Sequence, residues 1–398
     1  MSEETCISPG ISLGLNIHLP VSMGSKFWPK WGLPGILHHY VRYFSLYGTC
    51  LVTGNTTATD VYHLKTESLV TFEYTSHATR QPHSIIFVGG LSDGLGTSSF
   101  TSDIVEALQG TRWSFFTLNL TSSYQSWGLG HLDRDTDEIA QCIRYVKEYK
   151  TAIFGGDAKV VLVGHSTGSQ CVLHYLCQPN PHRSVPVFDP DLEHERRLAV
   201  DGAIMLAPIS DREAIHSVLD EGIGDNSAGE CRKVYGELVG IAKKAICQDK
   251  KWDTILPLSL TSQLGYGSTT PISARRFLSL ASPDSPQSPG EDDYFSADLS
   301  DEQLSTTFGA IQQRALLKNK LMVAPSGADQ AVPAWIDKER NLSRWETSTD
   351  HNGKFRFWDQ KHSGVIPGAS HAFSNDDQAE PRRILAERVI SFLQIMES

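Results

Sequence analysis

Residues 161–170 read VLVGHSTGSQ and place Ser166 in a Gly-x-Ser-x-Gly pattern, between an apolar run and a stretch that can continue as a helix. The pattern alone arises often by chance, so its context carries the prediction. A strand, a sharp turn and a helix expose a serine hydroxyl as a nucleophile, and Gly164 and Gly168 would let strand and helix approach closely. The sequence therefore predicts that Ser166 is the nucleophile of an acyl-transfer reaction.

A serine hydroxyl becomes a good nucleophile only when a base takes its proton, and that base needs an acid to orient it. Asp329 follows the apolar run at 320–324, and His371 lies in GASHAF ahead of a C-terminal helical pattern. The chain order Ser, Asp, His is that of α/β-hydrolases. We therefore predict Asp329 as the orienting acid and His371 as the general base. The alternatives left open are Asp337 or the Asp292–Asp293 pair as the acid, and His362 as the base.

Acyl transfer also needs backbone N–H donors for the oxyanion, one after the nucleophile and one in the loop after the third strand. Here these are the N–H groups of Thr167 and of Leu91 in VGGLSDGLG. That glycine-rich turn lacks the Lys of a P-loop, so a nucleotide site is not favoured. Further candidate substrate contacts are Gly90, Ser92, Trp127 and Ser210.

Strands and helices that alternate along the chain must position these residues. Short apolar runs predict strands buried on both faces, and helical spacing predicts a helix over 133–150. The alternation predicts an α/β fold of the α/β-hydrolase type, a mostly parallel central sheet flanked by helices. The predicted parallel strands are 84–88, 114–118, 159–163, 202–206, 320–324 and a last one around 363–367, with 60–64 and 69–74 as an antiparallel edge pair.

The spacing of the strands divides the chain into three parts. Residues 1–48 are predicted to be an irregular N-terminal extension, and 49–210 with 319–398 the α/β-hydrolase core. A large lid insertion is predicted over 211–318, before the strand that carries the acid. Within it, 283–304 holds seven acids, no base and three prolines, which favours a solvated loop, with a lid over the site as the alternative.

Charge and cysteine content exclude several classes of function. A net charge of -11 argues against binding to nucleic acid or to an acidic membrane surface. The N-terminus shows no basic leader and no apolar run is long enough to span a bilayer, so we expect a cytoplasmic protein. Seven cysteines without a Cys-x-x-Cys pair favour free thiols. The sequence spacing suggests no metal site and no cofactor, and it does not determine the oligomeric state.

Several blocks together resemble a family of fungal α/β-hydrolases that includes siderophore esterases, over roughly 45–398. The resemblance implies a serine esterase that opens ester bonds of fusarinine C-type hydroxamate siderophores through an acyl-enzyme, for iron release inside the cell. By matching motif, it implies the same roles for Ser166, Asp329 and His371. Two alternative functions remain open. One is a generic carboxylesterase or thioesterase, and the other is a ligand-binding protein without turnover. The blocks are FVGGLSDGL, SSYQSWG, DRDTDEI, VGHSTGSQ, APISDRE, DDYFSADL, SGADQAVP and PGASHAF.

Overall fold

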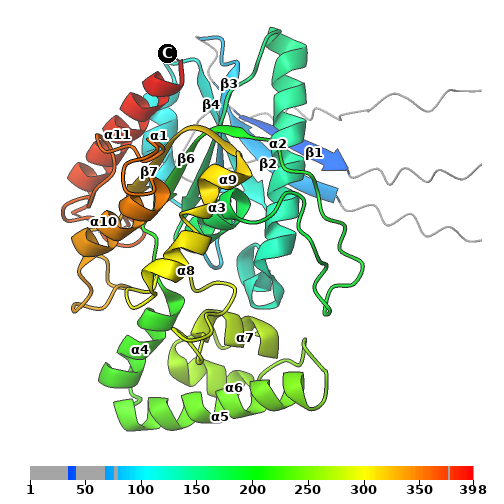
Figure 1. The fold of residues 1–398 in the computed structure, drawn as a ribbon, viewed down its shortest axis with the longest axis vertical. Coiled ribbons are helices and arrows are strands. Elements are labelled where there is room, and N and C mark those ends of the chain that lie inside the picture. Colours follow the sequence, from blue (N-terminus) through cyan, green and yellow to red (C-terminus); the bar gives the residue numbers. More distant parts are fainter. Residues whose placement is uncertain (1–34, 42–67, 76–78, 375–376, 398) are drawn as a thin grey trace, which may run out of the picture.

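The computed structural model describes residues 35–41, 68–75, 79–374 and 377–397. A seven-stranded sheet, in the order β1-β2-β4-β3-β5-β6-β7, runs through the centre (Figure 1). The first two pairings, β1 with β2 and β2 with β4, are antiparallel, and all others are parallel, which confirms that the sheet is mostly parallel. The strands are β1 Gly35–Val41, β2 Ser68–Tyr74, β3 His83–Val88, β4 Trp113–Asn119, β5 Val160–His165, β6 Val200–Leu206 and β7 Leu317–Ala324.

The inner strands are buried on both faces because helices cover the sheet on each side. Every residue of β3, β5 and β6 is buried, as their continuous apolar sequences predict. One apolar cluster lies between the sheet and the helices α2 and α3, and a second lies under α1 and α11. The bounds of these helices are α1 Thr101–Leu108, α2 Leu132–Phe154, α3 Thr167–Cys177 and α11 Ala379–Glu397.

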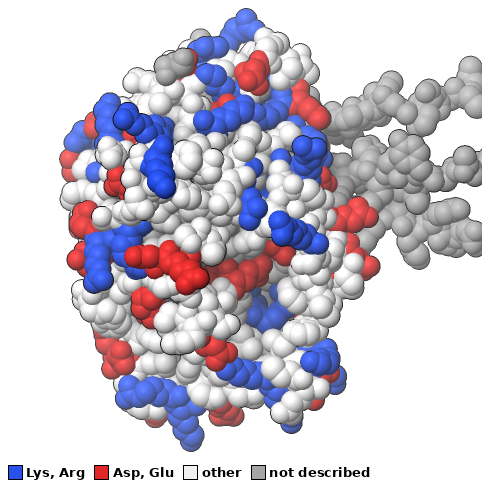
Figure 2. All heavy atoms as spheres, in the orientation of Figure 1, with Lys and Arg blue, Asp and Glu red and all other residues white. Residues whose placement is uncertain are grey.

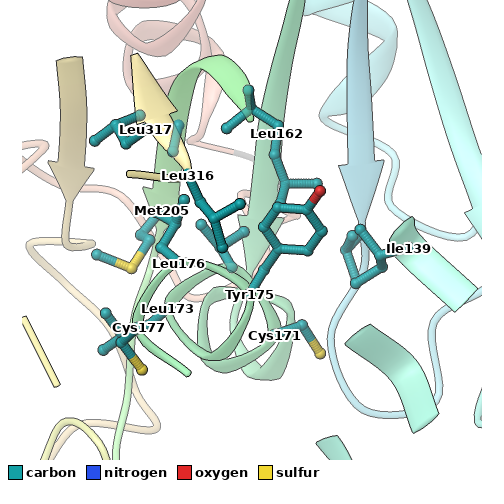
Figure 3. Close-up of a cluster of buried hydrophobic side chains, with 14 of the residues drawn as sticks. Ile139, Leu162, Cys171, Leu173, Tyr175, Leu176, Cys177, Met205, Leu316 and Leu317 are labelled. Atoms are coloured by element: carbon teal, nitrogen blue, oxygen red, sulfur yellow. The ribbon is translucent and has the colours of Figure 1, made fainter. Parts of the chain in front are cut away.

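Helix α3, which begins directly after Ser166, is buried along its whole length. Its residues Leu173 and Leu176 belong to the same apolar cluster as Leu162 of β5 and Met205 of β6 (Figure 3). Full burial of such side chains stabilises a fold by roughly 1.5–3 kcal/mol each. The helix that starts at the predicted nucleophile is thus anchored in the core.

The predicted insertion 211–318 divides into two structural parts. Helices α4 to α7 form a separate layer at one end of the molecule (Figure 1), with an apolar cluster of their own that includes Leu238 and Phe277. Helices α8 and α9 instead pack on the main core, where Phe308 is buried. The elements after β6 are α4 Asp211–Glu221, α5 Ala228–Cys247, α6 Leu258–Thr261, η3 Ser262–Leu264, α7 Ala274–Ala281, α8 Asp301–Thr306, α9 Ala310–Arg314 and α10 Lys338–Thr349; η2 Tyr124–Leu129 precedes α2.

Both ends of the sheet differ from the prediction. Residues 35–41, expected to be irregular, form the edge strand β1, which pairs with β2 while buried His38 bonds Glu73. The expected partner strand at 60–64 lies outside the described residues. The prediction of a last strand at 363–367 was wrong, because this segment forms only an isolated bridge, between Ile366 and Ser326. Pro367 has no N–H to donate, and Gly364 has a φ of 139°, so the segment cannot continue as a strand.

The acidic segment 283–304 is only in part the solvated loop that its composition favours, because 287–289 are exposed and 292–296 are buried. Asp292 is 1% exposed, and its carboxylate accepts two hydrogen bonds from the Arg276 guanidinium of α7, at 2.7 and 2.6 Å. Asp293 is also buried and lies 3.4 Å from the guanidinium of Arg212. Tyr294 follows in the main core. Cations from distant helices neutralise these acids, which composition could not reveal.

Within the described ranges, none of the helices has both the length and the apolar character needed to cross a bilayer. On the face drawn in Figure 2, basic and acidic side chains are interspersed rather than gathered into a continuous basic area. This agrees with the net charge of -11.

Candidate active site

Ser166 lies on the sharp turn between β5 and α3, with the strained backbone angles φ 55° and ψ -125°. The two flanking glycines make this turn possible. A Cβ at Gly164 would lie 2.0 Å from the carbonyl oxygen of Gly168, and a Cβ at Gly168 would lie 2.2 Å from that of Val88. Any side chain at either position would push strand and helix apart, which explains the Gly-x-Ser-x-Gly spacing physically.

The structure brings Ser166, His371 and Asp329 into one hydrogen-bonded row. The Oγ of Ser166 lies 2.9 Å from Nε2 of His371, and Nδ1 of His371 lies 2.8 Å from Oδ2 of Asp329. With Nδ1–H donated to the carboxylate, Nε2 is left to accept the proton of the serine hydroxyl. The Asp329 side chain is 1% exposed, so its charge acts on the imidazole with little screening by water.

Side chains outside the predicted set hold the loops of this row. The Nζ of Lys338 donates to the carbonyl oxygens of Ser326 and Gly327, at 2.8 and 2.9 Å, just before Asp329. Burial lowers the pKa of Lys338, although the charge of Asp329 opposes that shift. No local pattern in the sequence marks Lys338 for this position.

His165, which precedes the serine, also contacts the loop of His371. Its Nε2 lies 2.8 Å from the backbone carbonyl oxygen of His371 and donates to it. Burial lowers the pKa of His165 to about 4, so the ring is neutral at pH 7. The His165 ring therefore packs against the loop of His371 and does not take part in the hydrogen-bonded row at Ser166.

The glycine-rich turn after β3 lies against the serine. A Cβ on Gly90 would lie 2.8 Å from Cβ of Ser166, so only glycine fits there without displacement. The carboxylate of Asp93 accepts the Gly90 N–H at 2.9 Å and shapes the turn that contains Leu91. Thr167 is the first residue of α3, where a backbone N–H has no acceptor within the helix.

The predicted substrate contacts lie in three different places. Gly90 and Trp127 line a recess beside Thr167 and beneath Arg276, together with Leu91. Ser210 lines a second recess that reaches Asp329, and its Oγ bonds Ser296 at 2.6 Å and caps α4. Ser92 lines neither recess; it has a φ of 63° and its Oγ donates to the carbonyl of Leu91.

The alternative acids and base have partners elsewhere. His362 bonds Asp359 and Ser391 through its two ring nitrogens, at 2.5 and 2.8 Å. Asp337 caps α10 by accepting the N–H of Arg340 at 2.9 Å. The Asp292–Asp293 pair faces arginines, as described above. None of these alternative residues belongs to the hydrogen-bonded row of Ser166, His371 and Asp329.

Known proteins resemble the chain over nearly its whole length. It is 59% identical over 378 residues to fusarinine C esterase sidJ of Aspergillus fumigatus, covering 94% of this chain and 99% of that protein. It is 44% identical over 380 residues to esterase AN6793 of Emericella nidulans, covering 93% and 94%. The solved structure of siderophore hydrolase EstB from Aspergillus fumigatus matches with 56% identity and a TM-score of 0.77, covering 93% and 99%.

These matches establish the α/β-hydrolase fold, with the mostly parallel sheet and flanking helices described above. A family model described as protein of unknown function (DUF1749) matches residues 54–394, which include all three residues of the Ser166 row. From this extent of the match, and from the high identity to the relatives above, the chain belongs to the DUF1749 family.

Proposed function

We propose that this chain is a serine esterase that cleaves the ester bonds of hydroxamate siderophores of the fusarinine C type. The observation that carries the proposal is the hydrogen-bonded row of Ser166, His371 and Asp329 in a chain 59% identical to a fusarinine C esterase. The geometry supports acyl transfer, and the relatives' names supply the substrate class. The activity thus rests on two independent kinds of support.

In this proposal, His371 takes the hydroxyl proton of Ser166 as the oxygen attacks the ester carbonyl. The N–H groups of Thr167 and Leu91 stabilise the negative oxygen of the tetrahedral intermediate. The alcohol leaves with the proton from His371, which leaves an acyl group on Ser166. Water, activated by the same imidazole, then releases the acid and restores the serine.

We further propose that helices α4 to α7 act as a lid beside the substrate entrance. Arg276 of α7 donates from Nε to the carbonyl of Trp127 at 3.1 Å, and the N–H of Ser273 donates to Gly128 at 2.9 Å. These bonds join the layer to the rim of the recess at Leu91. Replacing 223–270 by a short linker should therefore change hydrolysis of a bulky siderophore far more than hydrolysis of a small acetate ester. Equal loss on both substrates contradicts this role.

We also assign the activity to the cytoplasm. The described cysteines are all free, and Cys247 is exposed as a thiol, which suits a reducing compartment. Microscopy of the fluorescently tagged full chain tests this assignment, and a secreted or organellar signal contradicts it.

Hydrolysis of defined substrates tests the siderophore proposal. Purified protein is incubated with ferric and iron-free fusarinine C and with p-nitrophenyl acetate, and the products are followed by mass spectrometry. We expect fusarinine C to be opened by the wild type and not by Ser166→Ala. Cleavage of the small ester alone favours a generic carboxylesterase or thioesterase. Failure on all substrates, without labelling by a fluorophosphonate probe, favours a binding protein.

A further inference from the structure

A second cluster of polar side chains lies beside the far end of α3 from Ser166. Asp133 comes from the start of α2, His174 from the last turn of α3, and His182 from the irregular segment 178–199 that leads to β6. The Oδ1 of Asp133 lies 2.8 Å from Nε2 of His174 and 2.8 Å from Nδ1 of His182. His174 follows Ser166 by eight positions, or about 12 Å along the helix axis. The cluster is therefore separate from the candidate active site.

The cluster is enclosed but reachable. The side chains of His174 and His182 are 4% and 6% exposed, while that of Asp133 is 17% exposed, so a small ion can arrive past the carboxylate. Burial opposes ionisation of Asp133, yet hydrogen bonds from the two imidazoles hold its pKa well below the usual range. Burial also lowers the pKa of His174, which favours the neutral imidazole that binds metals.

We propose that Asp133, His174 and His182 are the three protein ligands of a divalent transition-metal ion of the zinc class. The ligand atoms of these three residues lie within 4.8 Å of one another, whereas Glu291 belongs to a different group, with Asp133 and His131. Two imidazoles and one carboxylate, with the fourth position open, are a common zinc ligand set. Tetrahedral zinc separates its ligand atoms by about 3.3 Å, so the 2.8 Å contacts need to open by only about half an ångström.

The surroundings of the cluster suit ligands to a metal. Nδ1 of His174 lies 2.6 Å from the hydroxyl of Tyr294, which can accept a hydrogen bond from Nδ1–H when Nε2 binds the ion. The ring of His182 stacks on that of His194 at 4.6 Å, and Nδ1 of His194 lies 2.9 Å from Asp137 of α2. These contacts orient both imidazoles toward Asp133.

An ion at this position would fasten the segment 178–199 to α2 and α3. That segment has no helix or strand, and it leads from α3 into β6. A ligand that binds the folded chain and not the unfolded one raises stability in proportion to the logarithm of its concentration. The ion would therefore stabilise the end of α3 that is far from Ser166, and the ester chemistry at Ser166 would not need it.

Metal titration of the chelator-treated full chain tests the proposal. We expect one Zn²⁺ per chain in a competition assay with a chromogenic chelator, and a melting temperature that rises with Zn²⁺ concentration. Co²⁺ should produce the intense visible absorption bands of a tetrahedral site. His182→Gln and Asp133→Asn should weaken Zn²⁺ binding at least tenfold. His351→Gln, at a histidine that bonds the Gly309 carbonyl elsewhere, is the matched control and should bind as the wild type does.

Three results overturn the proposal. The first is a wild-type chain that takes up no stoichiometric Zn²⁺ and shows no tetrahedral Co²⁺ spectrum, a measurement that needs no variant to fold. The second is a folded His182→Gln chain with unchanged affinity. The third is loss of the bound ion in His371→Ala, because the ion would then belong to the row at Ser166. Retention by His371→Ala with loss in His182→Gln supports the site.

Discussion

The side chain of His165 donates a hydrogen bond to the backbone carbonyl of His371 across 206 residues of sequence, with 2.8 Å between Nε2 and the oxygen. His371 also forms a hydrogen bond with Ser166, the residue after His165. Two successive residues of the turn therefore each hold His371 through one hydrogen bond. The bond from His165 holds the loop of His371 against the carboxyl end of β5. It makes His165 a positioning residue for the proposed base.

Substitution of His165 should lower turnover without removing the nucleophile. We expect His165→Ala to reduce kcat about tenfold or more with little change in KM, because the His371 loop loses one anchor. His165→Gln, whose amide can donate to the same carbonyl, should recover part of the rate. Steady-state kinetics on p-nitrophenyl acetate measures both values. If His165→Ala and wild type share the same kcat, the hydrogen bond does not position His371.

Removal of any member of the Ser166 row should abolish most activity and leave a folded chain. We expect Ser166→Ala and His371→Ala to lower kcat by roughly 10⁵–10⁶, and Asp329→Asn by roughly 10⁴. The side chains are small parts of the core, so circular dichroism and melting temperature should change little. Near-full turnover by Asp329→Asn would reassign the acid, and Asp337→Asn would then be measured next.

A methyl group at Gly90 should impair catalysis more than stability. Its Cβ would lie 2.8 Å from Cβ and 3.2 Å from Oγ of Ser166, so Gly90→Ala must displace either the nucleophile or the turn of Leu91. We expect at least a tenfold loss in kcat/KM. Gly236→Ala in α5 is the matched control, since nothing lies within 4 Å of its Cβ and alanine should stabilise that helix by up to about 1 kcal/mol. Equal activity of the two variants contradicts the close approach at Gly90.

Stability should depend on pH through buried Glu138 of α2. Its oxygens accept from the N–H and hydroxyl of Thr121, at 2.8 and 2.7 Å, yet burial and then the charge of Asp135 raise its pKa to about 8. Because the folded chain holds this proton more tightly than the unfolded chain, Glu138 lowers the free energy of unfolding as pH rises from about 4.5 toward 8. Glu138→Gln should remove that part of the decline, on the order of a few kcal/mol at most.

Urea unfolding of wild type and Glu138→Gln at about pH 5 and pH 8 measures this effect. The free energy of unfolding of Glu138→Gln, relative to that of the wild type, should be higher at pH 8 than at pH 5. Parallel pH profiles of the two proteins would show that Glu138 ionises normally. Glu346→Gln, at a carboxylate that bonds exposed Gln360 on the surface, is the control.

The sequence predicted the strands, the helices and the turn at Ser166 because the residues that determine each of them are close together in the chain. The glycines around Ser166 are two residues away on each side, and the strand and helix that flank them follow from apolar spacing. The order of Ser166, Asp329 and His371 along the chain was enough to predict that they meet, since strands of a parallel sheet end at one edge. Apolar spacing also predicted six of the seven strands, β2 to β7, and the helix α2.

Tertiary structure decided whatever depends on partners far away in sequence. The acids at 292 and 293 read as part of a solvated loop, but arginines from α4 and α7 bury and neutralise them. The anchors Lys338 and His165 act through backbone carbonyls, which carry no sequence signal. The cluster of Asp133, His174 and His182 comes from three segments with no recognisable ligand spacing. Composition and periodicity report local preference and burial, whereas pairing of charges and polar groups is settled only when the folded chain brings them within hydrogen-bond distance.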